Sequence, residues 1–283
     1  MTSLATVVRG LLATHHAEWM RNAQAVFRKP TENAVHDMRV AGRKLRAALK
    51  LFKKYLPASS KPIDRGLFAI GTLLGTARDL DVHLAYIARG PAGLASYRKD
   101  CVEQLRQARR EVQEALRATS FYRLNETIEA LWKGKLLDAE RPANSAAHKL
   151  LKKQYRKLRK ASKSLKTDSA DAKLHRIRRA LRRMRYAAQF FEPLGKPALQ
   201  KIAAKLGKWQ DLLGYRQDRL TGGLLVLEYL ENQKKPLPLA EEKALLRLVR
   251  QMDREKEQFQ EQVFLGWSRS QRHKIKRILK SAF

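Results

Sequence analysis

Two stretches of this sequence, 139 residues apart, each begin with a histidine and carry an arginine three, seven and ten residues later. They are HDMRVAGRKLRAALKLF at 36–52 and HRIRRALRRMRYAAQFF at 175–191. An α-helix turns about 100° per residue, so the basic side chains of each stretch would share one face. Guanidinium groups match phosphate oxygens with paired N–H donors, and a protonated imidazole can donate there too. The spacing therefore predicts two phosphate-binding rows: His36, Arg39, Arg43, Arg46 and Lys50 in the first, and His175, Arg178, Arg182 and Arg185, with Arg179 beside them, in the second.

The opposite face of each predicted helix is apolar, with Met38 and Leu45 in the first and Leu181 and Met184 in the second. Each helix would therefore pack one face and present cations on the other. Like charges at this spacing repel by a few tenths of a kcal/mol per pair. The alternative is a solvated row, or one paired with acids elsewhere in the fold. Because Lys and Arg outnumber Asp and Glu 60 to 27, pairing cannot neutralise both rows.

Further cations at helical spacing extend the predicted site. They are Lys44 and Arg183, which match each other in the 139-residue frame, and Lys152, Arg156, Lys201, Lys205 and Lys208. The lysine row at 201–208 has no basic counterpart in the first half, so we expect the two halves to bind unequally.

The two histidines have two interpretations. Each could donate a hydrogen bond to phosphate, or it could be a structural residue held by a partner such as Asp79 or Asp218. Aspartates among so many cations are expected to orient Arg or His side chains rather than to catalyse.

The elements that position these rows come from an internal repeat. The 139-residue frame continues without a gap to Leu-Leu-Gly at 73–75 and 212–214, and to Asp79 and Asp218. Repeats of this kind indicate duplicated structural units. We expect a first unit at 1–137 and a second at 143–283, joined within LLDAERPANS at 136–145.

The apolar period is helical almost throughout, and no β-branched run alternates as a strand would. The fold class predicted is all-α. The expected helices span 3–27, 33–55, 61–89, 92–117, 120–132, 143–165, 169–191, 196–231 and 240–280, the last broken near Gly266.

The composition indicates a polyanion partner. A formal net charge of +33 is spread along the whole chain of 283 residues, and nucleic acid, an anionic membrane surface and a phosphate polymer all fit it. The single cysteine, Cys101, favours a reducing compartment, and we expect a cytoplasmic protein without a signal peptide or a membrane span.

Catalytic motifs are missing from the sequence. The stretch RDLDVH at 78–83 pairs Asp79 with His83 at helical spacing, but one such pair is a weak metal signal. No Gly-rich phosphate loop, HExxH, GxSxG or CxxC motif occurs. We therefore expect a non-enzymatic protein with no metal and no cofactor.

The aromatic residues of the two rows lie mainly on the apolar side, which favours a ligand recognised by its phosphates alone over a base-stacking nucleic acid. The stretches quoted above, each followed by its Leu-Leu-Gly and Asp, closely resemble the CHAD family, the conserved-histidine α-helical domains. The likeness spans nearly the whole chain, which would form one CHAD domain at 1–283. It implies two four-helix bundles related by a pseudo-twofold axis, with a basic channel between them that binds inorganic polyphosphate.

The resemblance also implies a location at polyphosphate granules and no catalytic activity. It places the family's histidines at His36 and His175 and its basic positions on the same two helices. Gly42 lies inside the first of these helices, where glycine lowers helix stability by about 1 kcal/mol relative to Ala. A nucleic-acid-binding or granule-associated protein that uses the same basic surface is the alternative function.

Overall fold

The computed structural model describes residues 2–58, 60–138, 140–163, 165–166 and 169–283. Within these ranges the chain is α-helical, with two short 3-10 turns and no named β-strand, so the predicted all-α class is confirmed. Residue 1 of the predicted first unit and residue 139 of the predicted junction lie outside the described residues. The α-helices are α1 (Leu4–Arg28), α2 (Glu32–Phe52), α3 (Ser60–Ile87), α4 (Ala95–Arg117), α5 (Thr119–Lys133), α6 (Ala143–Ser162), α7 (Asp171–Phe190), α8 (Pro197–Glu231), α9 (Leu239–Gly266) and α10 (Arg269–Ala282).

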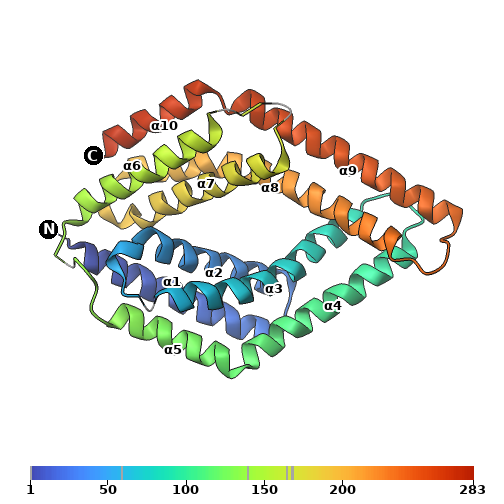
Figure 1. Cartoon of the computed structure of the whole chain (residues 1–283), viewed down its shortest axis with the longest axis horizontal. Helices are drawn as coiled ribbons and strands as arrows, with labels where there is room; N and C mark the ends of the chain where they lie inside the picture. Colours follow the sequence, from blue (N-terminus) through green and yellow to red (C-terminus); the bar gives the residue numbers. More distant parts are fainter. Residues whose placement is uncertain (1, 59, 139, 164, 167–168) are drawn as a thin grey trace.

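The helices form two halves that lie against each other, α1–α5 below and α6–α10 above in Figure 1, with both termini at the same end. The first two helices of each half begin 139 residues apart, α1 with α6 and α2 with α7. The halves meet where α2 contacts α7 and α3 contacts α8. The order and offset of the helices fit the repeat read from the sequence.

Each half has five α-helices in the described residues, while the resemblance implies four-helix bundles. The two counts are reconciled by a break in the last helix of each bundle. Ala118 alone, in extended conformation, separates α4 from α5, which continues the bundle by packing on α1 and α3. In the second half the expected break occurs at Gly266, where a Cβ atom would lie 2.2 Å from the Trp209 ring.

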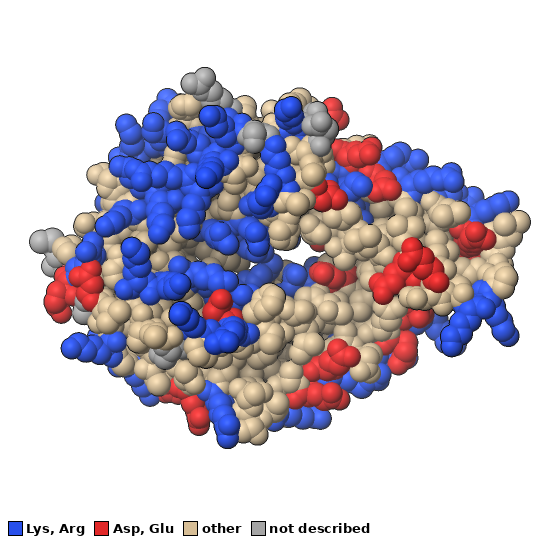
Figure 2. Space-filling view, in the orientation of Figure 1, with Lys and Arg blue, Asp and Glu red and all other residues tan. Residues whose placement is uncertain are grey.

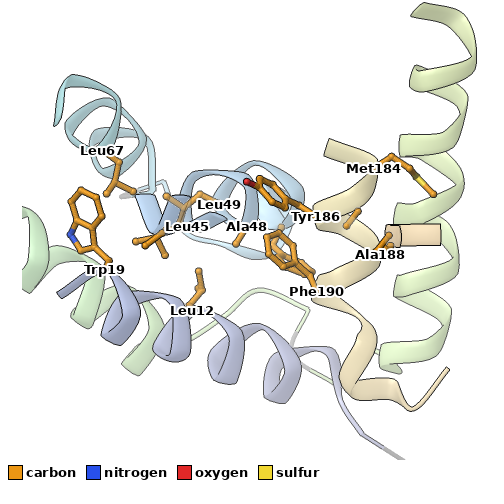
Figure 3. Packing of buried hydrophobic residues seen from close by; sticks show 14 of the residues in the cluster. Leu12, Trp19, Leu45, Ala48, Leu49, Leu67, Met184, Tyr186, Ala188 and Phe190 are labelled. Atoms are coloured by element: carbon orange, nitrogen blue, oxygen red, sulfur yellow. The ribbon is translucent and has the colours of Figure 1, made fainter. Parts of the chain in front are cut away.

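A continuous apolar core joins the two halves. In Figure 3, Trp19 of α1 and Leu45 of α2 lie in the same cluster as Tyr186 and Phe190 of α7. Phe52 contacts Phe190 across the boundary, with ring centroids 6.4 Å apart. Burial of this many large side chains on both sides fixes the position of α2 relative to α7.

Gly42 is explained by the same core. A Cβ atom at Gly42 would lie 2.7 Å from the buried Trp19 ring, whose Nε1 donates a hydrogen bond to Asn125 Oδ1 at 3.1 Å. The close approach of α1 to α2 therefore requires glycine here. The packing of Trp19 offsets the propensity cost expected from the sequence.

Candidate anion-binding site

A cleft of about 510 Å³ lies between the two halves, and helices from both of them line it. We refer to it as the basic cleft. Its charged and titratable lining residues are Arg43, Arg46 and Lys50 of α2, Lys157 of α6, and His175, Arg179, Arg182 and Arg183 of α7. Among the described residues, its lining includes no Asp or Glu. Figure 2 shows the Lys and Arg side chains gathered around this hollow, whereas Asp and Glu are more frequent at the other end of the same face.

Arg43 and Arg182 occupy equivalent positions in the two halves, and both line the cleft. Burial lowers the pKa of Arg43 to about 10, and the charges of Arg39 and Arg178 act in the same direction. Burial and then the charge of Arg43 lower the pKa of Arg182 in the same way. Both guanidinium groups remain charged at neutral pH. The buried Nε atom of Arg43 has no hydrogen-bond partner among the described residues.

At one end of the two rows, the cations meet two aspartates. Arg39 forms an ion pair with Asp79 at 3.7 Å. Burial raises the pKa of Asp79, while the charges of Arg39 and Arg178 lower it. Burial also raises the pKa of Asp218, which Arg178 lowers and the neighbouring Asp79 raises further. Asp79 therefore partly neutralises Arg39, and Asp218 lies close enough to Arg178 to act on its charge. Neither of these two arginines lines the basic cleft.

The two histidines differ in position. His175 lines the cleft, and the neighbouring Gln217 side chain acts to raise the pKa of its ring. His36 lies outside the lining, and its Nδ1 is buried without a partner in the described structure. Burial first, and neighbouring arginines second, lower the pKa of both rings. Among the described residues, no hydrogen bond joins either ring to Asp79 or Asp218, and His175 is the ring placed to meet a ligand.

Part of the first row is already neutralised. Asp64 accepts a hydrogen bond from Arg46 Nε at 2.9 Å and pairs with Lys50 Nζ at 3.2 Å. The Arg46 guanidinium also lies over the Phe68 ring, 4.7 Å from its centroid. These two cations line the cleft with reduced free charge.

Other predicted residues lie away from the basic cleft. Lys44 donates to Glu18 of α1 at 3.1 Å, so it does not act as the equivalent of Arg183. Arg185 packs against Gly207 and is not in the lining. The exposed lysines of α8 and two residues of α6 are also outside it: Lys201, Lys205, Lys208, Lys152 and Arg156.

Lys157 lines the cleft but is not among the site residues predicted from the sequence. It lies on α6, outside the two repeated stretches, and the pKa of its amine is lowered by burial, then by Lys153 and Arg183. The 139-residue frame contains a signal for this position, because Lys157 aligns with the acidic Glu18 and the charge is therefore reversed between the two halves.

Side chains of the RDLDVH stretch have protein partners in the fold. Asp81 accepts a hydrogen bond from Arg109 at 2.7 Å, and His83 Nε2 lies 2.6 Å from the Tyr97 hydroxyl in a buried cluster. Among the residues placed by the structure, no group of three or more His, Cys, Asp or Glu could hold a metal ion. Within the same residues, no helix has the length and apolarity needed to cross a membrane.

Comparison with known proteins places this arrangement in context. The family model of the CHAD domain matches residues 10–223. The crystal structure of the CHAD domain from the plant Ricinus communis superposes with a TM-score of 0.76 at 24% identity, over 99% of this chain and 92% of that one. PptA from Streptomyces chartreusis superposes with a TM-score of 0.71 at 17% identity, over 94% of this chain and 99% of that one. At these identities the likeness concerns the fold. No match was found among the curated proteins.

Proposed function

Because this chain belongs to the CHAD domain family, we propose that it binds inorganic polyphosphate in the basic cleft, without chemical turnover. The observation that carries the proposal is the lining itself. Seven Lys and Arg side chains from three helices converge on a cleft of about 510 Å³, and its described lining residues include no Asp or Glu. Such a site attracts a chain of phosphates strongly, since every phosphate meets a charge-assisted donor.

The chemistry of the lining favours a bare phosphate chain over nucleic acid. Binding single-stranded nucleic acid usually requires aromatic rings on which bases can stack. Tyr186 and Phe190 line the cleft but are 7% and 3% exposed, so they belong to the core. Arginine guanidinium groups, by contrast, bind phosphate oxygens directly and require no contact with a base.

One observation supports the alternative of a nucleic-acid ligand. Phe68, at the edge of the cleft, is 58% exposed, although Arg46 covers its ring. A base could stack there. Phe68→Ala separates the two functions, because it should weaken single-stranded DNA or RNA and leave the polyphosphate affinity unchanged.

The decisive experiment is a binding isotherm for polyphosphate at near-physiological salt. The variant Arg43→Glu/Arg182→Glu should lose binding and keep its helical circular dichroism. The matched control is Lys243→Glu/Arg247→Glu, which makes the same charge change on the exposed side of α9. Equal loss in both variants, or tight binding by the cleft variant, would place the ligand elsewhere.

Selectivity and turnover are tested with the same protein. Duplex DNA or RNA at equal phosphate concentration should fail to displace polyphosphate. Incubation with polyphosphate and Mg²⁺ or Mn²⁺ should release no phosphate, and release would show an enzyme. In cells, we expect the protein in the cytoplasm at polyphosphate granules, which co-localisation of a fluorescent fusion would test.

A further inference from the structure

The strongest charged feature outside the basic cleft lies on α6 and α10. Together the two helices carry thirteen Lys and Arg and no Asp or Glu. Their counterparts in the first half, α1 and α5, carry five Lys and Arg and three acids. An ordinary solvated face mixes both signs, because like charges on neighbouring helices repel.

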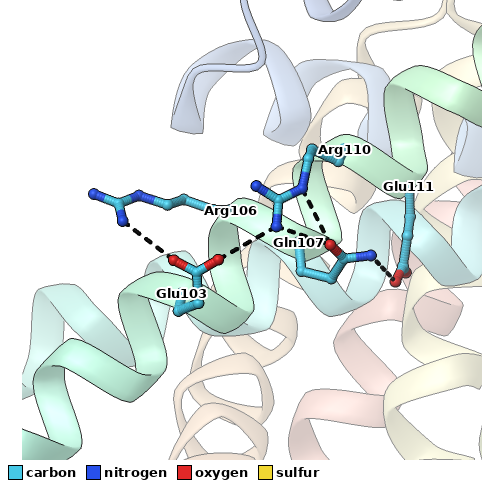
Figure 4. A network of polar contacts seen from close by, with 5 residues as sticks. All are labelled: Glu103, Arg106, Gln107, Arg110 and Glu111. Atoms are coloured by element: carbon cyan, nitrogen blue, oxygen red, sulfur yellow. Dashed lines mark hydrogen bonds and ion pairs between the residues drawn. The ribbon is translucent and has the colours of Figure 1, made fainter.

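Helix α4 provides the contrast within this protein. In Figure 4, Glu103 pairs with Arg106 at 3.2 Å and with Arg110 at 3.3 Å. Gln107 continues the network by donating to Glu111 at 3.0 Å. Arg106 and Arg110 thus have an acidic partner on their own helix, whereas the sequences of α6 and α10 contain no Asp or Glu.

Two adjoining hollows run between α6 and α10, and we refer to them together as the outer groove. One has a volume of about 500 Å³ and the other about 530 Å³, and both are lined by Tyr155, Arg159 and Lys276. The remaining Lys and Arg residues of the two linings are Lys152, Arg156, Lys163, Arg272 and Lys280. Among the described residues, no Asp or Glu belongs to either lining, so the groove is complementary to a polyanion along its length.

The aromatic residues of the outer groove are already engaged. The Tyr155 hydroxyl donates to the Arg272 carbonyl at 3.0 Å, which fixes its ring in the floor. Phe283 stacks on His148 with centroids 5.4 Å apart, and Lys196 lies over the Phe283 ring at 4.6 Å. Since these rings are occupied, the groove favours a ligand held by phosphates over one held by stacked bases.

Helix α6 joins this groove to the basic cleft. Lys157 lines the cleft, and Lys152 and Arg156 line the groove. At about 100° per residue, Lys153 and Lys160 project between the two linings. A phosphate chain leaving the cleft over α6 would meet cations and no acid from this helix.

We propose that the outer groove is a second polyphosphate-binding site, occupied by the continuation of a chain whose first segment lies in the basic cleft. This inference rests on the proposed function. Its consequence is a dependence on chain length. A short chain fills only the cleft, whereas a long chain engages both sites and gains affinity by effective concentration, without a new kind of contact.

The test compares tripolyphosphate with long-chain polyphosphate at near-physiological salt. The variant is Arg159→Glu/Lys276→Glu. Its control is Lys243→Glu/Lys274→Glu, with the same charge change at exposed positions outside both linings. Lys274 is two residues from Lys276 on α10 and points to the other side of the helix.

We expect the groove variant to weaken long-chain polyphosphate by about tenfold or more, as loss of a second linked site does, and to leave tripolyphosphate unchanged. The control should alter both affinities by no more than about twofold, through screened long-range charge alone. Equal losses in the two variants, or a parallel loss of tripolyphosphate, would overturn the second site. Loss of duplex DNA or RNA binding with long-chain polyphosphate unaffected would assign the groove to nucleic acid and also overturn it.

The two proposals fail in distinguishable ways. If Arg43→Glu/Arg182→Glu abolishes tripolyphosphate binding while the groove variant matches its control, only the second site is wrong. If the wild-type protein binds neither ligand, the proposed function fails and the second site fails with it.

Discussion

The two halves of the molecule share the order of their helices but differ in how they balance charge. Residues 1–142 contain 25 Lys and Arg against 14 Asp and Glu, a net charge of +11. Residues 143–283 contain 35 against 13, a net charge of +22. The excess cations of the second half lie around the basic cleft and the outer groove.

Equivalent positions show how the difference arises. Glu18, which pairs with Lys44 in the first half, is replaced 139 residues later by Lys157, beside Arg183. Asp64, which binds Arg46, is matched by Ala203. At these two positions the first half pairs Lys44 and Arg46 with acids, whereas among the described residues no ion pair is formed by their equivalents Arg183 and Arg185. The positive charge available to a ligand therefore depends on whether acidic side chains lie beside a basic row, and not only on the number of Lys and Arg in that row.

In this comparison, the largest expected effect on affinity comes from introducing the equivalent of Glu18 into the second half. Lys157→Glu should pair with Arg183 as Glu18 pairs with Lys44, removing two cations from the cleft. Each lost charge-assisted contact corresponds to about tenfold, so polyphosphate affinity should fall by about 100-fold. Isothermal titration calorimetry measures this loss.

The reciprocal change, Glu18→Lys, serves as the control. It frees Lys44, which does not line the cleft, so the affinity should change by less than about threefold, as expected for a screened charge. Similar effects of the two substitutions would show that the halves contribute equally.

A smaller effect is expected from removing single cations at equivalent positions. Arg183→Gln should weaken polyphosphate binding by about tenfold, the value of one charge-assisted hydrogen bond. Lys44→Gln should leave affinity unchanged, because Lys44 is engaged by Glu18. The comparison fails if Lys44→Gln is the more damaging of the two.

The third prediction concerns the acid of the first half. Asp64→Asn removes the carboxylate that neutralises Arg46 and Lys50, so the affinity for polyphosphate should rise a few-fold. The lost surface ion pairs should cost no more than about 1 kcal/mol of stability. Binding isotherms and thermal melts measure the two quantities, and unchanged or weaker binding would contradict the role given to Asp64.

The smallest expected effect is a dependence on pH carried by one histidine. Burial lowers the pKa of His175, so its ring is neutral at pH 7 in the free protein. A bound phosphate favours the protonated ring, and binding therefore takes up a proton. Affinity should consequently rise a few-fold as the pH falls from about 8 to about 5, the range in which His titrates.

His175→Gln should abolish this rise, whereas His36→Gln should retain it, because His36 lies outside the cleft lining. A rise that persists in His175→Gln would show that another group takes up the proton.

Much of the fold could be predicted from periodicity. The all-α class, the approximate helix ranges and the break at Gly266 are confirmed, since apolar residues at helical spacing must pack against something. The role of Gly42 could not be predicted, because its reason is the Trp19 ring, which approaches from a different helix.

For the candidate site, the sequence by itself determined that two helices each carry a cationic row opposite an apolar face. That result follows from helical geometry and requires no tertiary contact. Tertiary structure alone decided which cations share a cavity, because this depends on packing between distant segments. In the folded chain Arg43, Arg182 and Lys157 line the same cleft, whereas Lys44 is paired with Glu18 and does not line it. The physical reason is that the electrostatic interaction falls off with distance and is cancelled by a nearby opposite charge, and both conditions are set by the fold.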